Sequence, residues 1–208
     1  MTEQIEQRSD AWFTARLGKV TASRVADVIA KTKSGYSASR DNYMAQLICE
    51  RLTGQQGESF TNSAIQHGID CEPLARSAFE AYADVMVEEV GFVPHPRIRD
   101  SGASPDGLVG LFGMLEIKCP NTATHIDTLL TQTVPGKYIT QMQWQMRCCE
   151  RKWCDFVSFD PRLPQDLQLF IKRVDFDSVY VAMLEKEVNS FLEELVDKIK
   201  KLPRVKNV

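Results

Sequence analysis

The spacing of apolar and polar residues changes twice along the chain and divides it into a helical start, a strand-rich middle and a helical end. Ser9 precedes a short amphipathic segment that stops at Gly18, which is the pattern of a capped helix followed by a terminating glycine. Thr21 or Ser23 then caps a second short helix, which we expect to end at about Lys31.

A longer helix is predicted after a loop at residues 34–37. It is capped by Ser39 and ends near Thr53 and Gly54, and its apolar face carries Tyr43, Leu47, Ile48 and Leu52. Residues 62–83 are also expected to be helical. We expect a break at residues 70–73, because Pro73 lacks an N–H group and restricts the residue before it.

The middle of the chain alternates short apolar runs with turn residues, which is typical of strands. Gly107–Gly110 and Met114–Lys118 are the arms of a predicted hairpin. The other predicted strands or extended segments are Met86–Val90, Val93–Arg99, Trp153–Phe159 and Leu167–Val174. The predicted helices of this part, separated by the breaker Pro135-Gly136, are Thr122–Leu130 and Lys137–Glu150.

Residues 176–202 have the spacing of a long helix, whose apolar positions are Val179, Met183, Val188, Phe191, Leu192, Leu195 and Ile199. Its basic end is either a solvated terminus or a contact with a phosphate backbone. Helices surround a few strands without a repeated strand–helix–strand unit, so the pattern predicts an α/β fold with a mixed sheet. We expect one domain over residues 1–208, made of N-terminal helices at 9–83, a sheet core at 85–174 and the long helix at 176–202.

The composition is that of a globular protein, since 43% of the 208 residues are apolar and 25% are charged. The 25 basic and 28 acidic residues give a net charge of −3, which excludes a globally basic nucleic-acid binder and leaves only a local basic surface. No apolar run approaches the roughly 20 residues of a membrane-spanning helix. Residues 1–10 lack the regions of a secretory signal, and a cytoplasmic location is expected.

The six cysteines show no spacing typical of a zinc site, and we expect them to be small buried side chains. His67 and His95 are likewise expected to be structural.

Candidate chemistry is concentrated in the predicted hairpin. The turn Ser104-Pro105-Asp106-Gly107 brings Asp106 to the start of one arm, and Glu116 and Lys118 share a face of the other arm because they are two residues apart. Two close carboxylates repel each other unless a cation lies between them, and oxygen ligands favour Mg²⁺. Lys118 would then lie near the attacking water, which is the arrangement expected for phosphodiester hydrolysis.

The alternative interpretation of these residues is a Pro-Asp-Gly turn followed by a surface strand with a solvated ion pair. Two observations favour a site. Cys119-Pro120 ends the strand abruptly, and the apolar neighbours Leu108, Val109, Leu115 and Ile117 indicate a buried strand, where unpaired charges would be costly.

Seven short motifs, in this order and spacing, resemble those of the lambda-exonuclease-like viral recombinases of the YqaJ type, within the PD-(D/E)XK superfamily. They are Asp10-Ala11-Trp12, Arg16-Leu17-Gly18, Thr21-Ala22-Ser23, residues 68–72, Ser104-Pro105-Asp106-Gly107, Glu116-Ile117-Lys118-Cys119-Pro120 and Gln141-Met142-Gln143-Trp144. The resemblance covers about residues 9–162. It implies a restriction-endonuclease-like α/β core, with a central mixed β-sheet flanked by helices.

The resemblance also implies roles for individual residues. Asp106 and Glu116 would bind divalent metal together with the backbone carbonyl of Ile117, and Lys118 would act on the nucleophilic water. Glu72 would be a further metal ligand, and Gln141 would lie beside the catalytic site. Without the resemblance, the favoured interpretation of Glu72 would be a helix-start acid, and that of Gln141 an exposed helix residue.

A second set of residues would contact DNA. Arg16 and Ser23 match positions that hold a terminal 5′-phosphate in the family, and Ser104 would also face a phosphate. Ile65 matches an apolar wedge that separates the terminal bases, or is a core residue. The family's Arg after Lys-Cys-Pro is absent from this chain, so that Thr124 or His125 takes its place or the phosphate pocket is built differently.

The activity that the resemblance implies is Mg²⁺-dependent 5′→3′ degradation of one strand of linear double-stranded DNA, with two metal ions per active site and Mn²⁺ as a substitute. The products would be 5′-mononucleotides and 3′ overhangs for phage-type recombination in a bacterial host cell. The implied partners are double-stranded DNA ends, two further copies of the chain in a ring-shaped homotrimer, and a single-strand annealing protein. The alternatives are an endonuclease or repair nuclease on the same core, and a non-catalytic DNA-binding module.

Overall fold

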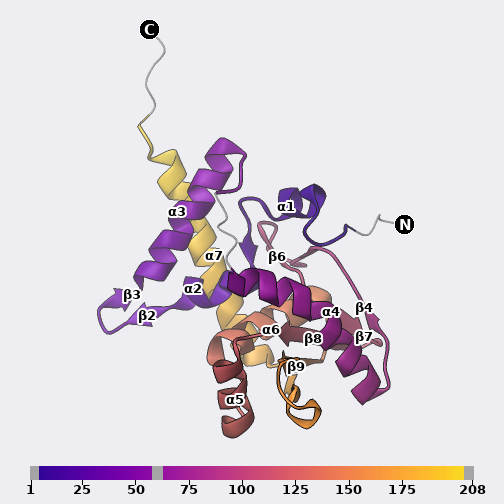
Figure 1. Cartoon of the computed structure of the whole chain (residues 1–208). Coiled ribbons are helices and arrows are strands. Elements are labelled where there is room, and N and C mark those ends of the chain that lie inside the picture. The colour runs from indigo at the N-terminus through magenta and orange to yellow at the C-terminus, as the bar shows by residue number, and fades with distance from the viewer. Residues whose placement is uncertain (1–4, 58–62, 204–208) are drawn as a thin grey trace.

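The computed structural model describes residues 5–57 and 63–203 (Figure 1). Within these residues the helices are α1 (Asp10–Arg16), η1 (Ala22–Arg24), α2 (Val25–Ile29), α3 (Ala38–Thr53), α4 (Ser63–Ala83), α5 (Thr122–Thr131), α6 (Gly136–Cys149), η2 (Gln165–Leu167) and α7 (Ser178–Lys200). The strands are β1 (Val20–Thr21), β2 (Lys31–Thr32), β3 (Gly35–Tyr36), β4 (Val87–Glu88), β5 (Val93–Pro94), β6 (Ser101–Ala103), β7 (Gly107–Val109), β8 (Gly113–Lys118), β9 (Trp153–Phe159) and β10 (Leu169–Asp175). None of the described helices has the length and apolar character to cross a membrane.

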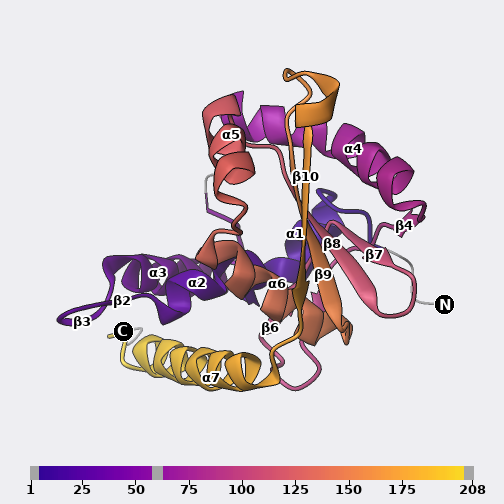
Figure 2. The same cartoon turned by 90° about the horizontal axis from the view of Figure 1, so that it is seen from below.

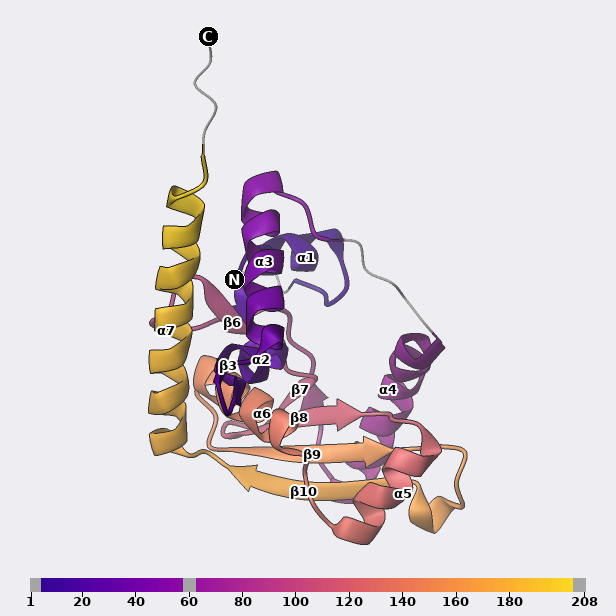
Figure 3. The same cartoon turned by 90° about the vertical axis from the view of Figure 1, so that its left-hand side faces the viewer.

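The largest sheet has the strand order β10-β9-β8-β7-β4 and is mixed, as predicted. β8 and β9 are parallel, with Glu116 opposite Phe156, whereas the other neighbours in this sheet pair antiparallel. The parallel pair requires the chain to cross from the end of β8 to the start of β9, and α5 and α6 make this crossing. Figure 3 shows β8, β9 and β10 side by side with α5 at their end.

Helices cover both faces of this sheet (Figure 2). On one face, Ala75 and Phe79 of α4 pack against Leu115 and Ile117 of β8. On the other face, Met142 and Met146 of α6 join a cluster that contains Met114, Phe156 and Phe170. Side chains alternate along a strand, so Glu116 and Lys118 lie on the face of Met114, towards α6. Ile117 lies in the core beneath α4, which confirms the predicted alternation.

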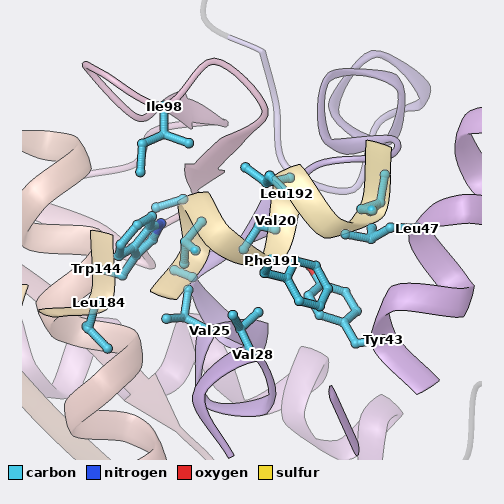
Figure 4. Packing of buried hydrophobic residues seen from close by; sticks show 14 of the residues in the cluster. Val20, Val25, Val28, Tyr43, Leu47, Ile98, Trp144, Leu184, Phe191 and Leu192 are labelled. Atoms are coloured by element: carbon cyan, nitrogen blue, oxygen red, sulfur yellow. The ribbon is translucent and has the colours of Figure 1, made fainter. Parts of the chain in front are cut away.

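A second core joins the N-terminal helices to the last helix (Figure 4). Tyr43 of α3 stacks on Phe191 of α7 with ring centroids 5.8 Å apart. Val25 and Val28 of α2 are fully buried in the same cluster, and Trp144 connects it to α6. α6 therefore packs between the two cores and fixes the N-terminal helices relative to the sheet.

A small sheet with the order β1-β6-β5 leads into the predicted hairpin. β1 pairs parallel to β6, with Val20 opposite Ser101. β6 had no counterpart among the predicted strands. It is three residues long and contains Ser101 and Gly102, so it lacks an apolar alternation. Its place next to β1 brings residues 16–24 close to the turn at residues 104–107.

Several local predictions are confirmed. Ser9 caps α1 by accepting a hydrogen bond from the Trp12 N–H group, and Gly18 follows with a φ of +67°. Gly54 ends α3 with a φ of +68°. The predicted bounds of β9 agree with the structure, and those of the hairpin, α5 and α6 agree within one residue.

Other predictions are wrong at their ends. The segment expected to be one helix from Thr21 or Ser23 to Lys31 is a 3-10 turn followed by the short helix α2, and no side chain caps either. The loop at residues 34–37 contains β3, which pairs with β2. Ser37, not Ser39, precedes α3. The strand expected at 86–90 contains only Val87 and Glu88, and β10 begins at Leu169.

The break expected at residues 70–73 is absent, and α4 continues through Pro73. Pro73 lies on the exposed side of the helix, where water can bond the carbonyl group that loses its N–H donor. The opposite side, with Cys71, Ala75 and Phe79, is buried against the sheet. This packing outweighs the lost hydrogen bond. Residue 62, the predicted start of the helix, lies outside the described residues.

Three residues assigned to apolar helix faces are exposed instead. They are Leu52 in α3 and Val179 and Met183 in α7. In α7 the buried positions are shifted, so that Val181 and Leu184 join the core together with the predicted Val188, Phe191, Leu192 and Leu195.

Candidate active site

Asp106 is positioned by the turn between β6 and β7 and by a hydrogen bond across the hairpin. Its Oδ2 atom accepts from the backbone N–H of Ile117 at 2.6 Å. Gly107 allows the close approach of β4 that this turn needs, because a Cβ atom there would lie 2.1 Å from Cγ1 of Val87. The structure thus places the carboxylate of Asp106 beside the middle of Glu116-Ile117-Lys118, as the sequence predicted.

Glu116 is fully buried and accepts hydrogen bonds at both carboxylate oxygens. Oε1 accepts from Lys118 Nζ and from Gln141 Nε2, the latter at 2.6 Å, and Oε2 accepts from Gln145 Nε2 at 2.7 Å. Gln141 and Gln145 are one turn apart on α6, so they present their amides to the sheet together. The three donors offset much of the cost of burying this carboxylate.

Gln141 was identified from the resemblance, but Gln145 was not. The available signal was the spacing of four residues on a helix that crosses the strand bearing Glu116.

Lys118 lies between the two carboxylates and the ring of Tyr138, which is 5.2 Å from its Nζ atom. Burial alone would lower the pKa of Lys118, but the charges of Glu116 and Asp106 outweigh it and hold this pKa above its ordinary value. The ammonium group therefore stays charged. It can orient a water molecule and stabilise negative charge, but it is a poor proton acceptor in this state.

Asp106 is in the opposite situation. Burial, and then the negative charge of Glu116, raises the pKa of the Asp106 carboxyl above its ordinary range, although Lys118 acts against this. Within the described residues, its Oδ1 atom accepts no hydrogen bond. A carboxylate with an available oxygen, next to a second carboxylate, suits a divalent cation that would favour its ionised form. These residues therefore fit the expected Mg²⁺.

Glu72 reaches the same region from α4, where its carboxylate is bound by two guanidinium groups. Oε2 accepts from Arg8 Nη2 at 2.5 Å, and Oε1 accepts from Arg76 Nη2 at 3.1 Å. Among the residues that the structure describes, no three His, Cys, Asp or Glu side chains are grouped closely enough to hold a metal ion. Glu72 thus faces the site without joining Asp106 and Glu116 in one ligand cluster.

These side chains line a cavity of about 530 Å³, whose wall includes Arg8, Ile65, Glu72, Asp106, Ile117, Lys118 and Tyr138. Ile65 is 49% exposed on α4, so it is not a core residue. Ile65 lines this cavity, so an apolar side chain lies beside Asp106 and Lys118. The resemblance implied that this side chain is the wedge.

The predicted phosphate-binding residues lie together on the neighbouring β1–β6 side. Arg16 and Ser23 line a second cavity of about 180 Å³. The Oγ atom of Ser104 accepts from Arg16 Nη1 at 3.0 Å and from Trp12 Nε1 at 2.9 Å. The Arg16 guanidinium also stacks over the Trp12 ring, 4.0 Å from its centroid.

Arg16 has the electrostatic properties of an anion-binding group. Burial lowers the pKa of its guanidinium, which means that its charge is partly desolvated. In the described part of the chain, no carboxylate lies within ion-pair distance of Arg16, although Glu50 lines the same cavity and accepts from Gly18 N and Gln46 Nε2. A bound phosphate would supply the missing counter-charge.

The proposed substitutes for the absent family Arg are not in this pocket. His125 is fully buried, and its ring nitrogens lie 2.7 Å from Ser158 Oγ and 2.9 Å from the Leu167 carbonyl oxygen. Thr124 is exposed on α5 and lines neither cavity. Lys19 and Arg24 line the cavity together with Arg16 and Ser23. The sequence analysis missed both cations.

The chain is similar to known proteins in both sequence and structure. Residues 11–152 match the sequence model of the YqaJ-like viral recombinase domain. A crystal structure of an alkaline exonuclease from Laribacter hongkongensis, LHK-Exo, is 53% identical, with a TM-score of 0.87 over 92% of this chain and 95% of that one. The same figures apply to LHK-Exo in complex with dAMP.

A phage-related exonuclease from Haemophilus somnus shares the fold at 15% identity, with a TM-score of 0.73 over 89% of this chain and 96% of that chain. A search of curated proteins finds no match.

Proposed function

The chain belongs to the YqaJ-like viral recombinase family, and we propose that it is a Mg²⁺-dependent 5′→3′ exonuclease that degrades one strand of linear double-stranded DNA. The observation that carries this proposal is the convergence of Asp106, Glu116 and Lys118 on the β7–β8 hairpin, where Asp106 and Lys118 line one cavity and Glu116 is buried beside them. The likeness to the alkaline exonuclease LHK-Exo over nearly the whole chain supports the same class of reaction.

In the proposed reaction, Asp106, Glu116 and the Ile117 carbonyl would hold the metal, with Glu72 as a further ligand. Bound there, Mg²⁺ would polarise the scissile phosphodiester and help to ionise a nearby water molecule, and Mn²⁺ could replace it. Two ions per site would stabilise both the attacking and the leaving oxygen. Lys118 would orient the water molecule and offset the negative charge that grows on the phosphate.

Gln141 and Gln145 would act through Glu116. Their amide groups donate to opposite carboxylate oxygens, at 2.6 and 2.7 Å, and thereby fix the plane of that carboxylate. A ligand held in one orientation needs little rearrangement when substrate binds.

The second cavity would hold the phosphate at the 5′ end of the strand that is degraded. Arg16 would bind it through its guanidinium fork, with Ser23 and Ser104 as hydroxyl partners. Ser104 accepts from Arg16 and lies two residues before Asp106, so the two cavities are connected by one turn of the chain. This arrangement supports cleavage close to a 5′ end. Ile65 would separate the terminal base pair.

The products would be 5′-mononucleotides and a 3′ single-stranded tail. LHK-Exo has been crystallised with dAMP, a mononucleotide of this type. As in the family that the sequence resembles, three copies of the chain would form a ring around the duplex, and a single-strand annealing protein would take up the tail during recombination. A ring retains DNA without strong affinity, which suits a chain whose net charge is −3.

The test is a digestion time course with Mg²⁺. The substrates are linear duplexes with and without 5′-phosphates, labelled on either strand end, and a covalently closed circle. We expect loss of 5′-labelled ends from linear DNA only, and no loss with Asp106→Asn. Cleavage of the circle would indicate an endonuclease, and binding without cleavage under any divalent metal would indicate a binding module.

A further inference from the structure

Arg8 lies at the catalytic cavity although it belongs to the segment before the first helix. The side chains of its two neighbours, Gln7 and Ser9, fix its position. Nε2 of Gln7 donates to the carbonyl oxygens of Val90, at 2.7 Å, and of Pro105, at 2.8 Å, and Ser9 caps α1. Arg8 itself has a φ of +69°, a conformation that side-chain-bearing residues adopt infrequently. The chain thus turns sharply beside the turn that carries Asp106.

The Arg8 side chain points to the cavity wall and pairs with Glu72. Nη2 of Arg8 lies 2.5 Å from Oε2 of Glu72, and the Arg8 side chain is 46% exposed, compared with 18% for Glu72. Within the described residues, this is the one ion pair that Arg8 makes. Arg8 is also among the residues that line the cavity, and nearly half of its side chain is exposed.

Glu72 already has another guanidinium partner. Arg76, one turn further along α4, donates to Oε1 of Glu72 at 3.1 Å and is only 13% exposed. Arg76 also binds Glu89 at 2.6 Å and donates to the Asp106 carbonyl oxygen. Arg76 is thus largely buried and held by several contacts, whereas Arg8 is half-exposed and contacts only Oε2 of Glu72 among the described carboxylates.

From these contacts, and resting on the proposed function, we propose that Arg8 is an exchangeable counter-ion. It binds Glu72 in the metal-free enzyme and binds a phosphate of the DNA strand in the cavity when Glu72 holds metal. A divalent cation bound at Oε2 of Glu72 would weaken the pair between this oxygen and the Arg8 guanidinium, because the two positive charges would repel at this distance. Arg8 lines the same cavity as Asp106 and Lys118, so a displaced guanidinium would be able to pair with a phosphodiester bound there, and its fork geometry suits one.

The exchange has two consequences that can be measured without cleavage. Arg8 competes with metal for Glu72, so Arg8→Gln should bind Mg²⁺ about tenfold more tightly when DNA is absent, which corresponds to 1.4 kcal/mol. Arg8 also contributes to DNA binding, so Arg8→Gln should bind a duplex about tenfold more weakly in Ca²⁺. Arg8→Lys should lie between wild type and Arg8→Gln in both measurements.

The matched control is Arg97→Gln. Arg97 is also an exposed arginine that pairs with a glutamate, Glu185. This pair joins the loop after β5 to α7, and neither residue lines either cavity. Calorimetric titration of the EDTA-treated full chain with MgCl₂ gives the first affinity, and fluorescence anisotropy of a labelled duplex in CaCl₂ gives the second.

Unchanged or weaker Mg²⁺ binding by Arg8→Gln would overturn the counter-ion assignment, and a general loss of structure could only weaken binding. Unchanged duplex binding would overturn the phosphate contact. Both readings are independent of hydrolysis. If wild type failed to cut DNA while Arg8→Gln bound Mg²⁺ more tightly, the proposed function would fail and the counter-ion assignment would stand.

Discussion

The carboxylate of Asp106 and the backbone N–H of Ile117 are joined by a hydrogen bond of 2.6 Å across the β7–β8 hairpin. Ile117 points its side chain into the core beneath α4, so this bond connects the candidate catalytic carboxylate directly to a buried strand. The neighbours of Ile117 in sequence, Glu116 and Lys118, are held on the other face of that strand. The position of Asp106 relative to both is therefore fixed by the sheet.

Asp106→Asn should abolish cleavage and at the same time stabilise the metal-free protein at alkaline pH. The folded-state pKa of Asp106 is raised, so folding binds a proton that the unfolded chain releases, and wild-type stability falls as pH rises from about 4 towards the folded-state pKa. Asparagine retains an acceptor for Ile117 N but carries no charge. Thermal unfolding in EDTA should show that the melting temperature falls less between pH 5 and pH 9 in the variant than in wild type.

Adding Mg²⁺ at about 100 times its Kd should stabilise wild type by about 2.7 kcal/mol through binding to the folded state, and Asp106→Asn much less. Equal stabilisation of both proteins would argue against Asp106 as a metal ligand.

Gln145→Leu should lower the cleavage rate by about tenfold to a hundredfold, because Oε2 of Glu116 would lose its donor while remaining buried. Gln143→Leu is the control on the same helix. Gln143 donates to the Asp175 carbonyl and accepts from Asp177 N, so its loss should cost about 1–3 kcal/mol of stability without weakening metal binding. Single-turnover rates and Mg²⁺ titrations of the two variants separate these effects. Similar metal affinities in both would exclude a role for Gln145 in holding Glu116.

Arg16→Gln should remove most of the preference for 5′-phosphorylated ends. A charge-assisted hydrogen bond to a phosphate contributes about 1.5–3 kcal/mol, so the ratio of kcat/KM for phosphorylated over unphosphorylated duplex should fall by about tenfold to a hundredfold. The rate on unphosphorylated ends should change little. Arg97→Gln serves again as the control. A ratio that stays constant in Arg16→Gln would locate the terminal phosphate elsewhere.

His95 should make folding sensitive to mild acid. Burial, only partly offset by Glu185, lowers the pKa of His95 to about 4, and its Nδ1 atom accepts from Arg97 N and Ile98 N. The unfolded chain protonates first, at about pH 6.5, so stability is lost as pH falls from there to about 4, by at most about 3 kcal/mol.

Urea unfolding at pH 7.5, 6 and 5 should show this slope in wild type and in His67→Gln, whereas His95→Gln should be less stable at pH 7.5 but lose less on acidification. The same slope in all three proteins would assign it to other groups.

Gly107→Ala should destabilise the fold by about 1–3 kcal/mol and reduce cleavage, because the added methyl group would overlap Cγ1 of Val87. Val87→Ala in the same chain should restore part of both properties. Failure of this double variant to recover stability would show that the backbone conformation, and not the contact, requires glycine.

The parts of the fold that the sequence predicted well are those fixed by local chemistry. Ser9, Gly18 and Gly54 mark helix ends through capping and positive φ, and five of the seven residues of β9 are apolar. The errors arise where tertiary packing decides. Pro73 is tolerated because it faces solvent, and Val179 and Met183 are exposed because α7 presents a slightly rotated face to α3 and α6.

The candidate site shows the same division. Asp106, Glu116 and Lys118 follow from the spacing of a hairpin, and Arg16, Ser23 and Ser104 follow from motif order. Gln145, Arg8 and Lys19 could not be found in this way, because their places beside the two cavities depend on how α6, the N-terminal segment and β1 approach the sheet in three dimensions.

The short path from Ser104 to Asp106 has a consequence for product length under the proposed function. Two residues span at most about 7 Å of extended chain, so the Cα atoms of Ser104, whose hydroxyl contacts Arg16, and of Asp106, whose carboxylate would serve the reacting phosphate, stay within that distance of each other. The turn would keep a constant spacing between the site that binds the 5′ end and the site of cleavage. Each cut would therefore release a product of constant length, whatever the base sequence.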